Sequence, residues 1–178
     1  MSEYKAMLVR AREEEIEEMA MMAAYIVEEH IESYYGRKQK AYMMEHIYTA
    51  EHMRQEMEAG DRFYWLDCIP AGEEESVLGM LDVCGYLSCS LQEDAILIKN
   101  VYIMSEIRGR HILRECLDLL KQDELPEGIS KIQIAIPEGY VQAINVFEHL
   151  GFTRIAKVEV PLNERYTLNC LQLELSIR

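Results

Sequence analysis

Residues 96–113, ILIKNVYIMSEIRGRHIL, carry the signals that decide the fold of this chain. The first eight residues are mostly apolar, which predicts a buried strand. An Arg-Gly-Arg turn at 108–110 then opens a stretch in which apolar residues recur at helical spacing up to Lys121. At the start of such a helix the backbone N–H groups have no partner within the helix, and they carry the positive end of its dipole. The strand, turn and helix therefore predict a binding site for an anion such as phosphate.

On both sides of this stretch, apolar residues recur either at helical spacing or at every second position. Gly36, Gly60 and Gly151 follow helical stretches, where glycine commonly ends a helix. The last two strands are joined by a Pro-Leu-Asn-Glu-Arg connection, which predicts a closing antiparallel hairpin. The predicted elements are a strand over 5–10, helices over 12–36 and 38–59, strands over 63–69, 76–89 and 96–103, a helix over 109–121, a strand over 131–136, a helix over 140–150, and strands over 152–160 and 167–177.

With these elements in place, the chain resembles the GNAT superfamily of acyl-CoA-dependent N-acyltransferases. The resemblance rests on Arg108 and Gly109 in the phosphate turn, on the Leu-Gly-Phe run at 150–152, and on the order of the elements. It covers nearly the whole chain and implies one GNAT-fold domain over residues 1–178. This is an α/β fold in which a mixed, mostly antiparallel sheet of about seven strands is flanked by about four helices.

The resemblance also implies where the cosubstrate acetyl-CoA binds. In the family, the fourth strand splits from the fifth, and backbone groups of the fourth strand hold the pantetheine arm and the acyl carbonyl. The turn and the helix start after that strand hold the phosphates. A plain core strand would show the same apolar residues, but it would not be followed by the arginine turn. The implied cofactor-binding residues are Val101, Tyr102, Ile103, Arg108, Gly109, Arg110, His111, Ile112, Leu113 and Phe147.

Three residues depart from the family's pattern. His111 and Leu113 stand where the family has small residues, and their side chains would crowd the approach of a pyrophosphate to the backbone. His111 itself either contacts a phosphate or is a polar residue of the first helical turn. Phe147 stands where the family often has a tyrosine that protonates the departing thiolate, and it has no proton to give.

Acyl transfer needs an uncharged amine, so a general base or a chain of water molecules must take the proton of the amine. Asp82, within an otherwise apolar strand, is the candidate base, although an exposed position on a sheet face explains it equally well. Tyr140 stands at the start of the fourth helix, where it either reaches the active site or stacks at the helix start. We therefore take Asp82 and Tyr140 as the catalytic candidates. The sequence has no metal-ligand spacing.

Methionine and tyrosine are concentrated on the two N-terminal helices, where the family builds its acceptor groove. Flexible thioethers and amphipathic phenols suit an adaptable groove, whereas helical spacing is more commonly explained by core packing. A homodimer interface is a third interpretation. These residues are Met19, Met21, Met22, Tyr34, Tyr35, Tyr42, Met43, Met44, Tyr48, Met53 and Met57.

The chain is strongly acidic, with 32 Asp and Glu against 18 Lys and Arg and a formal net charge of −14. Such a surface repels phosphates, so nucleic acid and anionic membranes are excluded as main partners. It favours a cationic or amine substrate, although excess acid also serves simply to keep a protein soluble. The N-terminal residues have no apolar leader segment and the five cysteines are scattered, which predicts a cytoplasmic protein with reduced core thiols.

These observations predict an N-acetyltransferase that transfers an acetyl group from acetyl-CoA to an amine of a small molecule or peptide, by direct attack in a ternary complex. The alternative is a non-catalytic GNAT-fold binding or assembly module that has lost CoA binding. The loss of the small residues in the phosphate turn and of the tyrosine donor makes that alternative credible.

Overall fold

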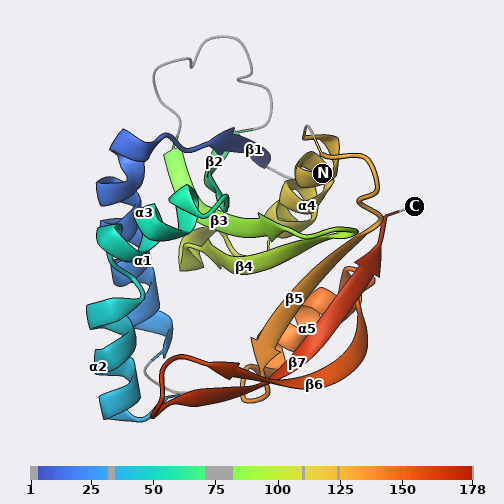
Figure 1. Ribbon diagram of the computed structural model, residues 1–178. Coiled ribbons are helices and arrows are strands. Elements are labelled where there is room, and N and C mark those ends of the chain that lie inside the picture. Colours follow the sequence, from blue (N-terminus) through green and yellow to red (C-terminus); the bar gives the residue numbers. More distant parts are fainter. Residues whose placement is uncertain (1–3, 32–34, 71–81, 110, 124, 178) are drawn as a thin grey trace.

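The computed structural model describes residues 4–31, 35–70, 82–109, 111–123 and 125–177. Its seven strands form one sheet in the order β1-β2-β3-β4-β5-β7-β6, with helices on both faces (Figure 1). The elements are β1 (Tyr4–Arg10), the 3₁₀ turn η1 (Glu13–Glu15), α1 (Ile16–Ile31), α2 (Arg37–His46), α3 (Ala50–Glu58), β2 (Arg62–Pro70), β3 (Asp82–Leu91), β4 (Ala95–Ile103), the 3₁₀ turn η2 (Ser105–Ile107), α4 (Ile112–Gln122), β5 (Lys131–Pro137), α5 (Val141–His149), β6 (Thr153–Pro161) and β7 (Thr167–Ser176).

Two apolar cores lie on opposite faces of the sheet. The α1–α3 core joins residues of the first three helices, such as Met19 and Met53, to Phe63 and Tyr86 of the sheet. The α4–α5 core joins the apolar side of α4 and α5 to residues from β1 to β5 and β7. Core packing therefore explains Met19 and Met53, both almost fully buried. An acceptor groove is not needed to explain why these two methionines occur at helical spacing.

The sheet opens between β4 and β5, its one parallel pair. These strands pair only over Ala95–Ile98 and Lys131–Ile134. Beyond that point, β4 continues beside β3 to Ile103, and β5 continues beside β7 to Pro137, without pairing to each other. We refer to residues 99–103 as the open half of β4. The divergence predicted from the family resemblance is therefore present in the backbone.

The seven strands and the mixed sheet agree with the prediction, but the structure has five helices rather than about four. The helix predicted over 38–59 is broken into α2 and α3 because Thr49 starts a new helix. Its backbone is extended and its side chain accepts a hydrogen bond from the N–H of His52 (3.2 Å). The apolar spacing continues through the break, so the periodicity alone does not reveal it.

Two other boundaries differ from the prediction. The first predicted helix begins with η1 and continues as α1 to Ile31; residues 32–34 of its expected end lie outside the described residues. The third strand starts at Asp82, and its predicted first part, 76–81, also lies outside them. Among the helices that the structure describes, none has the length and apolar character needed to cross a bilayer.

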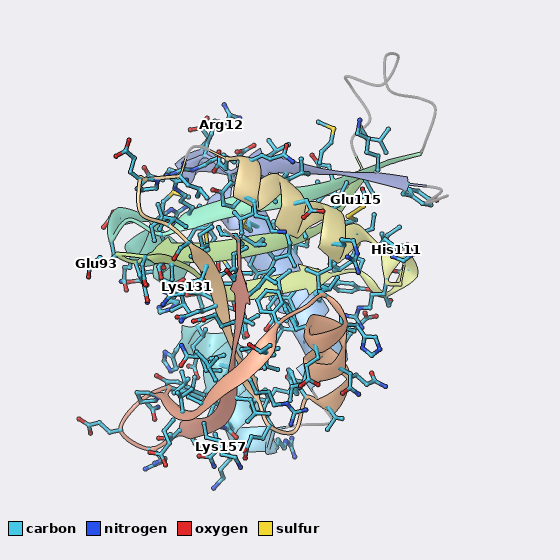
Figure 2. The ribbon with its side chains drawn as sticks, turned by 90° about the vertical axis from the view of Figure 1, so that its right-hand side faces the viewer. Arg12, Glu93, His111, Glu115, Lys131 and Lys157 are labelled. Carbon is cyan, nitrogen blue, oxygen red and sulfur yellow. A yellow bond between two sulfur atoms is a disulfide. The ribbon has the colours of Figure 1, made fainter. Side chains whose placement is uncertain are left out.

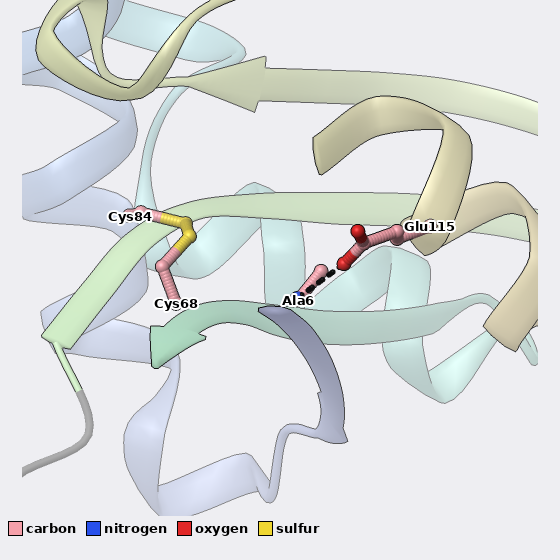
Figure 3. Close-up of a disulfide and its surroundings, with 4 residues drawn as sticks. All are labelled: Ala6, Cys68, Cys84 and Glu115. Carbon is pink, nitrogen blue, oxygen red and sulfur yellow. Dashed lines mark hydrogen bonds between the residues drawn. A yellow bond between two sulfur atoms is a disulfide. The ribbon is translucent and has the colours of Figure 1, made fainter. Parts of the chain in front are cut away.

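The prediction that all five cysteines are free thiols is wrong, because Cys68 and Cys84 form a disulfide between β2 and β3 (Figure 3). The register of this strand pair shifts between Leu66 and Asp67, which leaves Cys84 as an extra residue beside Cys68. The two Cα atoms are 6.1 Å apart, within the usual range for a disulfide. The other three cysteines are free and buried.

Candidate active site

Hydrogen bonds hold the connection from β4 to α4 against the ends of β3 and β4. The backbone N–H of Met104 donates to the carbonyl of Cys84 (2.8 Å). The Nε group of Arg108 donates to the carbonyl of Ile103 (2.9 Å). We call residues 104–111 the phosphate turn. These bonds place its arginine directly after the open half of β4.

The phosphate turn changes direction through two left-handed residues, Gly109 with φ of 78° and His111 with φ of 61°. Among the described residues other than glycine, His111 is the one with a positive φ. Glycine adopts this conformation most readily, so His111 keeps the backbone conformation that the family's small residue would favour. The turn and His111 therefore precede the helix proper, and α4 starts at Ile112 rather than at Gly109 as predicted. Arg110, a predicted cofactor-binding residue, lies outside the described residues.

The start of α4 is not capped by the side chain of its N-cap residue, His111. That side chain is exposed (Figure 2). Ile112 is buried and Leu113 packs against the α4–α5 core, so only the backbone N–H groups of these two predicted binding residues point along the helix axis. The carboxylate of Glu115 accepts a hydrogen bond from the N–H of Ala6 in β1 (2.6 Å; Figure 3). Glu115, the acidic residue of the first turn, is therefore hydrogen-bonded to the backbone of β1.

The three predicted residues of the open half of β4 divide between the two faces of the sheet. Val101 and Ile103 pack against the α4–α5 core, and Tyr102 packs against the α1–α3 core. Gly85 of β3 lies so close to this strand that a Cβ atom there would collide with the carbonyl of Tyr102. The close approach of β3 therefore holds the backbone of Tyr102 along one edge of β4. The other edge has no strand partner on β5.

Five tyrosines from different parts of the chain meet beside the open half of β4, and we call them the tyrosine cluster. The hydroxyls of Tyr48 and Tyr102 are hydrogen-bonded at 2.7 Å. The rings of Tyr86 and Tyr102 lie with centroids 5.6 Å apart, and those of Tyr35 and Tyr140 lie 5.8 Å apart. Two of the rings contact that of Tyr102, and all five tyrosines belong to the α1–α3 core.

Burial keeps these phenols protonated. It raises the pKa of Tyr35 to about 12, and it raises the pKa of Tyr48, Tyr86 and Tyr102 well above 10. The hydroxyl of Tyr86 is fully buried and has no hydrogen-bond partner among the described residues. At neutral pH these four phenols are therefore protonated, and none of them is a base.

The two predicted catalytic residues lie in different places. Tyr140 is at the start of α5, packs its ring against that of Tyr35, and contacts both cores, so it lies where the sheet opens. Asp82 is the first residue of β3, opposite Cys68. Since Gly85 already faces Ile103, the last residue of β4, the backbone of Asp82 lies beyond the open half of β4. The structure does not bring these two residues together.

Phe147 lies in the α4–α5 core. It is 4% exposed and its ring packs edge-on against Phe152 with a centroid distance of 5.1 Å.

Two surface depressions among the described residues lie away from the phosphate turn. One, of about 440 Å³, lies between α2 and the β6–β7 connection, and the other, of about 260 Å³, lies along β6 and β7 beside Glu138.

Sequence reasoning missed Tyr86, whose ring packs against Tyr102 of the site, and considered Tyr48 only as part of the helical pattern. The register of β3 and β4 places Tyr86 opposite Tyr102. A predicted hairpin with aligned strands could have revealed this pair, but the register shift between Ser88 and Cys89 hides the alignment in the sequence. Tyr48 reaches Tyr102 only through tertiary packing.

Comparisons with known proteins agree with this geometry. The family model described as the acetyltransferase (GNAT) family matches residues 24–152. No curated protein matches the chain. Among solved structures, the chain is similar to a GCN5-related N-acetyltransferase from Rhodopseudomonas palustris, with 14% identity, a TM-score of 0.71, and coverage of 97% of this chain and 96% of that one.

Two further structures show the same fold at low identity. PaiA N-acetyltransferase from Thermoplasma acidophilum, in complex with coenzyme A, has 11% identity, a TM-score of 0.64, and coverage of 97% of this chain and 99% of that one. A mutant of the spermidine N-acetyltransferase SpeG from Vibrio cholerae has 10% identity, a TM-score of 0.60, and coverage of 97% and 94%. Because the family model matches well over half of the sequence, the chain belongs to the acetyltransferase (GNAT) family, whose members are acyl-CoA-dependent acyltransferases.

Proposed function

We propose that this protein transfers an acetyl group from acetyl-CoA to an amine of a small molecule or peptide. The observation that carries the proposal is the divergence of β4 from β5 immediately before the phosphate turn and the uncapped start of α4. An unpaired strand edge followed by free N–H groups suits a ligand with an amide-containing arm and a phosphate group. Coenzyme A has both.

The residues that are present fit this cosubstrate. The backbone of Val101, Tyr102 and Ile103 would bind the pantetheine arm as an added strand. Arg108, Gly109 and the N–H groups at the start of α4 would bind the phosphates. Acetyl-CoA, when bound, supplies an acetyl group activated as a thioester.

The remaining chemistry is proton transfer around the amine. The neutral phenols of Tyr48 and Tyr102 can donate a hydrogen bond at the opening, and Tyr140 is the candidate donor on the α5 side. Asp82 remains the base to be tested. Because its backbone lies beyond the open half of β4, it would take the proton of the amine through water.

Two observations support a cationic amine as the acceptor. One similar structure is a spermidine N-acetyltransferase, which supports a cationic amine as the acceptor class. The net charge of −14 supports it independently, because an acidic surface concentrates cations near the protein. We place the reaction in the cytoplasm, where the three buried free thiols are typical and the Cys68–Cys84 disulfide is unusual.

The first test is isothermal titration calorimetry with acetyl-CoA and with CoA. The wild-type protein is expected to bind both in the micromolar range. Arg108→Ala is expected to weaken binding about tenfold, since it removes a charged hydrogen-bond donor from the phosphate turn. Arg54→Ala, which removes the same charge from an exposed pair with Glu17 on the α1–α3 side, is the matched control and should bind as the wild type does.

A second candidate function is a binding or assembly module of the same fold that no longer binds CoA. His111 in the phosphate turn, Leu113 in the first turn of α4, and the buried Phe147 are the observations that favour it. If the wild-type protein binds neither compound, this second function replaces the first. If binding is normal but Arg108→Ala leaves it unchanged, the phosphate site has been assigned to the wrong residues.

A further inference from the structure

Tyr48 and Tyr102 form a phenol pair at the open half of β4. Tyr48 is 7% exposed and follows α2, while Tyr102 is partly exposed and belongs to the strand itself. Their hydroxyl oxygens are 2.7 Å apart, and either one can be the donor. Two hydroxyls that share one hydrogen bond leave one further proton available to a third group. The pair is therefore a fixed source of one donated hydrogen bond.

The ring of Tyr86 lies next to this pair. It is fully buried, packs against the ring of Tyr102, and has a hydroxyl without a partner among the described residues. Burial disfavours the charged phenolate form of Tyr102 and so raises its pKa well above 10. Tyr102 thus remains a donor throughout the pH range in which amines become neutral and reactive.

The reaction needs such a donor, and the position that often supplies it in the family is Phe147. The Phe147 ring carries no proton and is packed into the α4–α5 core. Tyr102 is the phenol carried by the strand whose backbone would hold the acyl group. Tyr140 also lies at the opening, but it belongs to the start of α5 and not to that strand, and its ring packs against the ring of Tyr35. Tyr102 is therefore the better placed of the two.

We propose that the hydroxyl of Tyr102 hydrogen-bonds the sulfur of coenzyme A and protonates it during transfer, with Tyr48 as the positioning residue that aims this hydroxyl. The inference rests on the proposed function. In the step, the amine nitrogen forms a bond to the acetyl carbon, and the carbon–sulfur bond breaks with its electron pair moving to sulfur. Tyr102 gives its proton to that sulfur. The proton lost by the amine restores Tyr102 through solvent.

The test compares CoA with desulfo-CoA, which lacks the sulfur, by isothermal titration calorimetry. The wild-type protein is expected to bind CoA about three- to tenfold more tightly, the effect of one hydrogen bond to a thiol or thiolate. Tyr102→Phe should remove this preference while leaving desulfo-CoA affinity unchanged. Tyr48→Phe should reduce the preference, because the Tyr102 hydroxyl is no longer held in one direction.

Tyr86→Phe is the matched control. It removes a hydroxyl from the same cluster and keeps the ring, so the preference for CoA should remain as in the wild type. Thermal unfolding of each variant shows that it is folded. The comparison needs no acceptor and no turnover.

The outcomes separate this inference from the proposed function. Binding of neither compound by the wild-type protein would overturn both. Equal affinity for both compounds, or an unchanged preference in Tyr102→Phe, would overturn only the inference. Loss of the preference in Tyr86→Phe would mean that any disturbance of the cluster acts in the same way, which also overturns it. Loss in Tyr140→Phe but not in Tyr102→Phe would assign the proton to Tyr140.

Discussion

His111 stands where the family resemblance implies a small residue, yet its backbone adopts a left-handed conformation. Its φ of 61° is one that a residue with a Cβ atom adopts at a cost of roughly 1–2 kcal/mol. The side chain makes no cap to α4, so no capping hydrogen bond from this residue offsets that cost. The backbone conformation at residue 111 is therefore expected to lower the stability of the protein.

This strain predicts the stability of two variants. His111→Gly and His111→Ala both remove the imidazole, and they differ only in the Cβ atom. Glycine escapes the left-handed cost but loses more backbone entropy on folding, so His111→Gly should be more stable than His111→Ala by about 0.5–1 kcal/mol. Urea denaturation of both variants measures the difference. Equal stability would mean that residue 111 is not left-handed in solution.

At the same scale, the sequence predicts residues that belong to a continuous motif. Arg108, Gly109 and Tyr102 lie within one stretch, so their position relative to the end of β4 follows from chain order alone. Tyr86 and the partner of Cys68 do not. Each depends on a register shift between neighbouring strands, and one additional residue in a strand leaves no mark on its apolar pattern.

Among the elements, α4 connects the phosphate turn to the edge of the sheet. Strand β1 has β2 on one side only, so its other edge would present unpaired N–H groups. Glu115 covers part of this edge by accepting the N–H of Ala6 at 2.6 Å. The helix that starts at the phosphate turn is thereby fixed to β1, the edge strand at one end of the sheet.

Removal of this contact should destabilise the protein. Glu115→Ala is expected to lower the free energy of unfolding by about 1.5–3 kcal/mol, because a charged acceptor of a partly buried N–H is lost. Glu115→Gln keeps an acceptor and should cost less, about 1 kcal/mol. The control is Asp118→Ala on the same helix, where an exposed pair with Lys121 should contribute less than about 0.5 kcal/mol. Chemical denaturation compares the three; similar losses for Asp118→Ala and Glu115→Ala would contradict the role of Glu115.

Elements with strong periodicity were predictable, and the breaks within them were not. The buried side of α4 follows the apolar spacing of the sequence, and each of the seven strands was expected. The division of one predicted helix into α2 and α3 depends on a single side-chain cap at Thr49. Such a cap stabilises a helix start by only about 1 kcal/mol, so it is decided by tertiary context as much as by sequence.

For the whole molecule, the order of strands and helices is what the sequence predicted best, because short connections restrict the topologies that a mixed sheet can adopt. The site is harder to predict because it is assembled between two cores. Tyr48 approaches from the helices on one face and Tyr140 from the start of α5, and they lie near Tyr102 only once the sheet has formed. The order of residues along the chain does not reveal that these three tyrosines lie close together.

The charge of the whole molecule gives the last prediction. Thirty-two acidic against eighteen basic residues produce a negative field that attracts a cationic acceptor over a distance set by salt, about 10 Å at 0.1 M ionic strength. For spermidine or an aminoglycoside, kcat/KM should therefore fall severalfold as NaCl rises from 20 to about 300 mM, a range over which the screening length shortens severalfold. A small monoamine of lower charge, assayed in parallel, should lose much less. If the two kinds of acceptor respond alike, salt acts on CoA binding or on the protein itself, and the acidic surface has no part in choosing the acceptor.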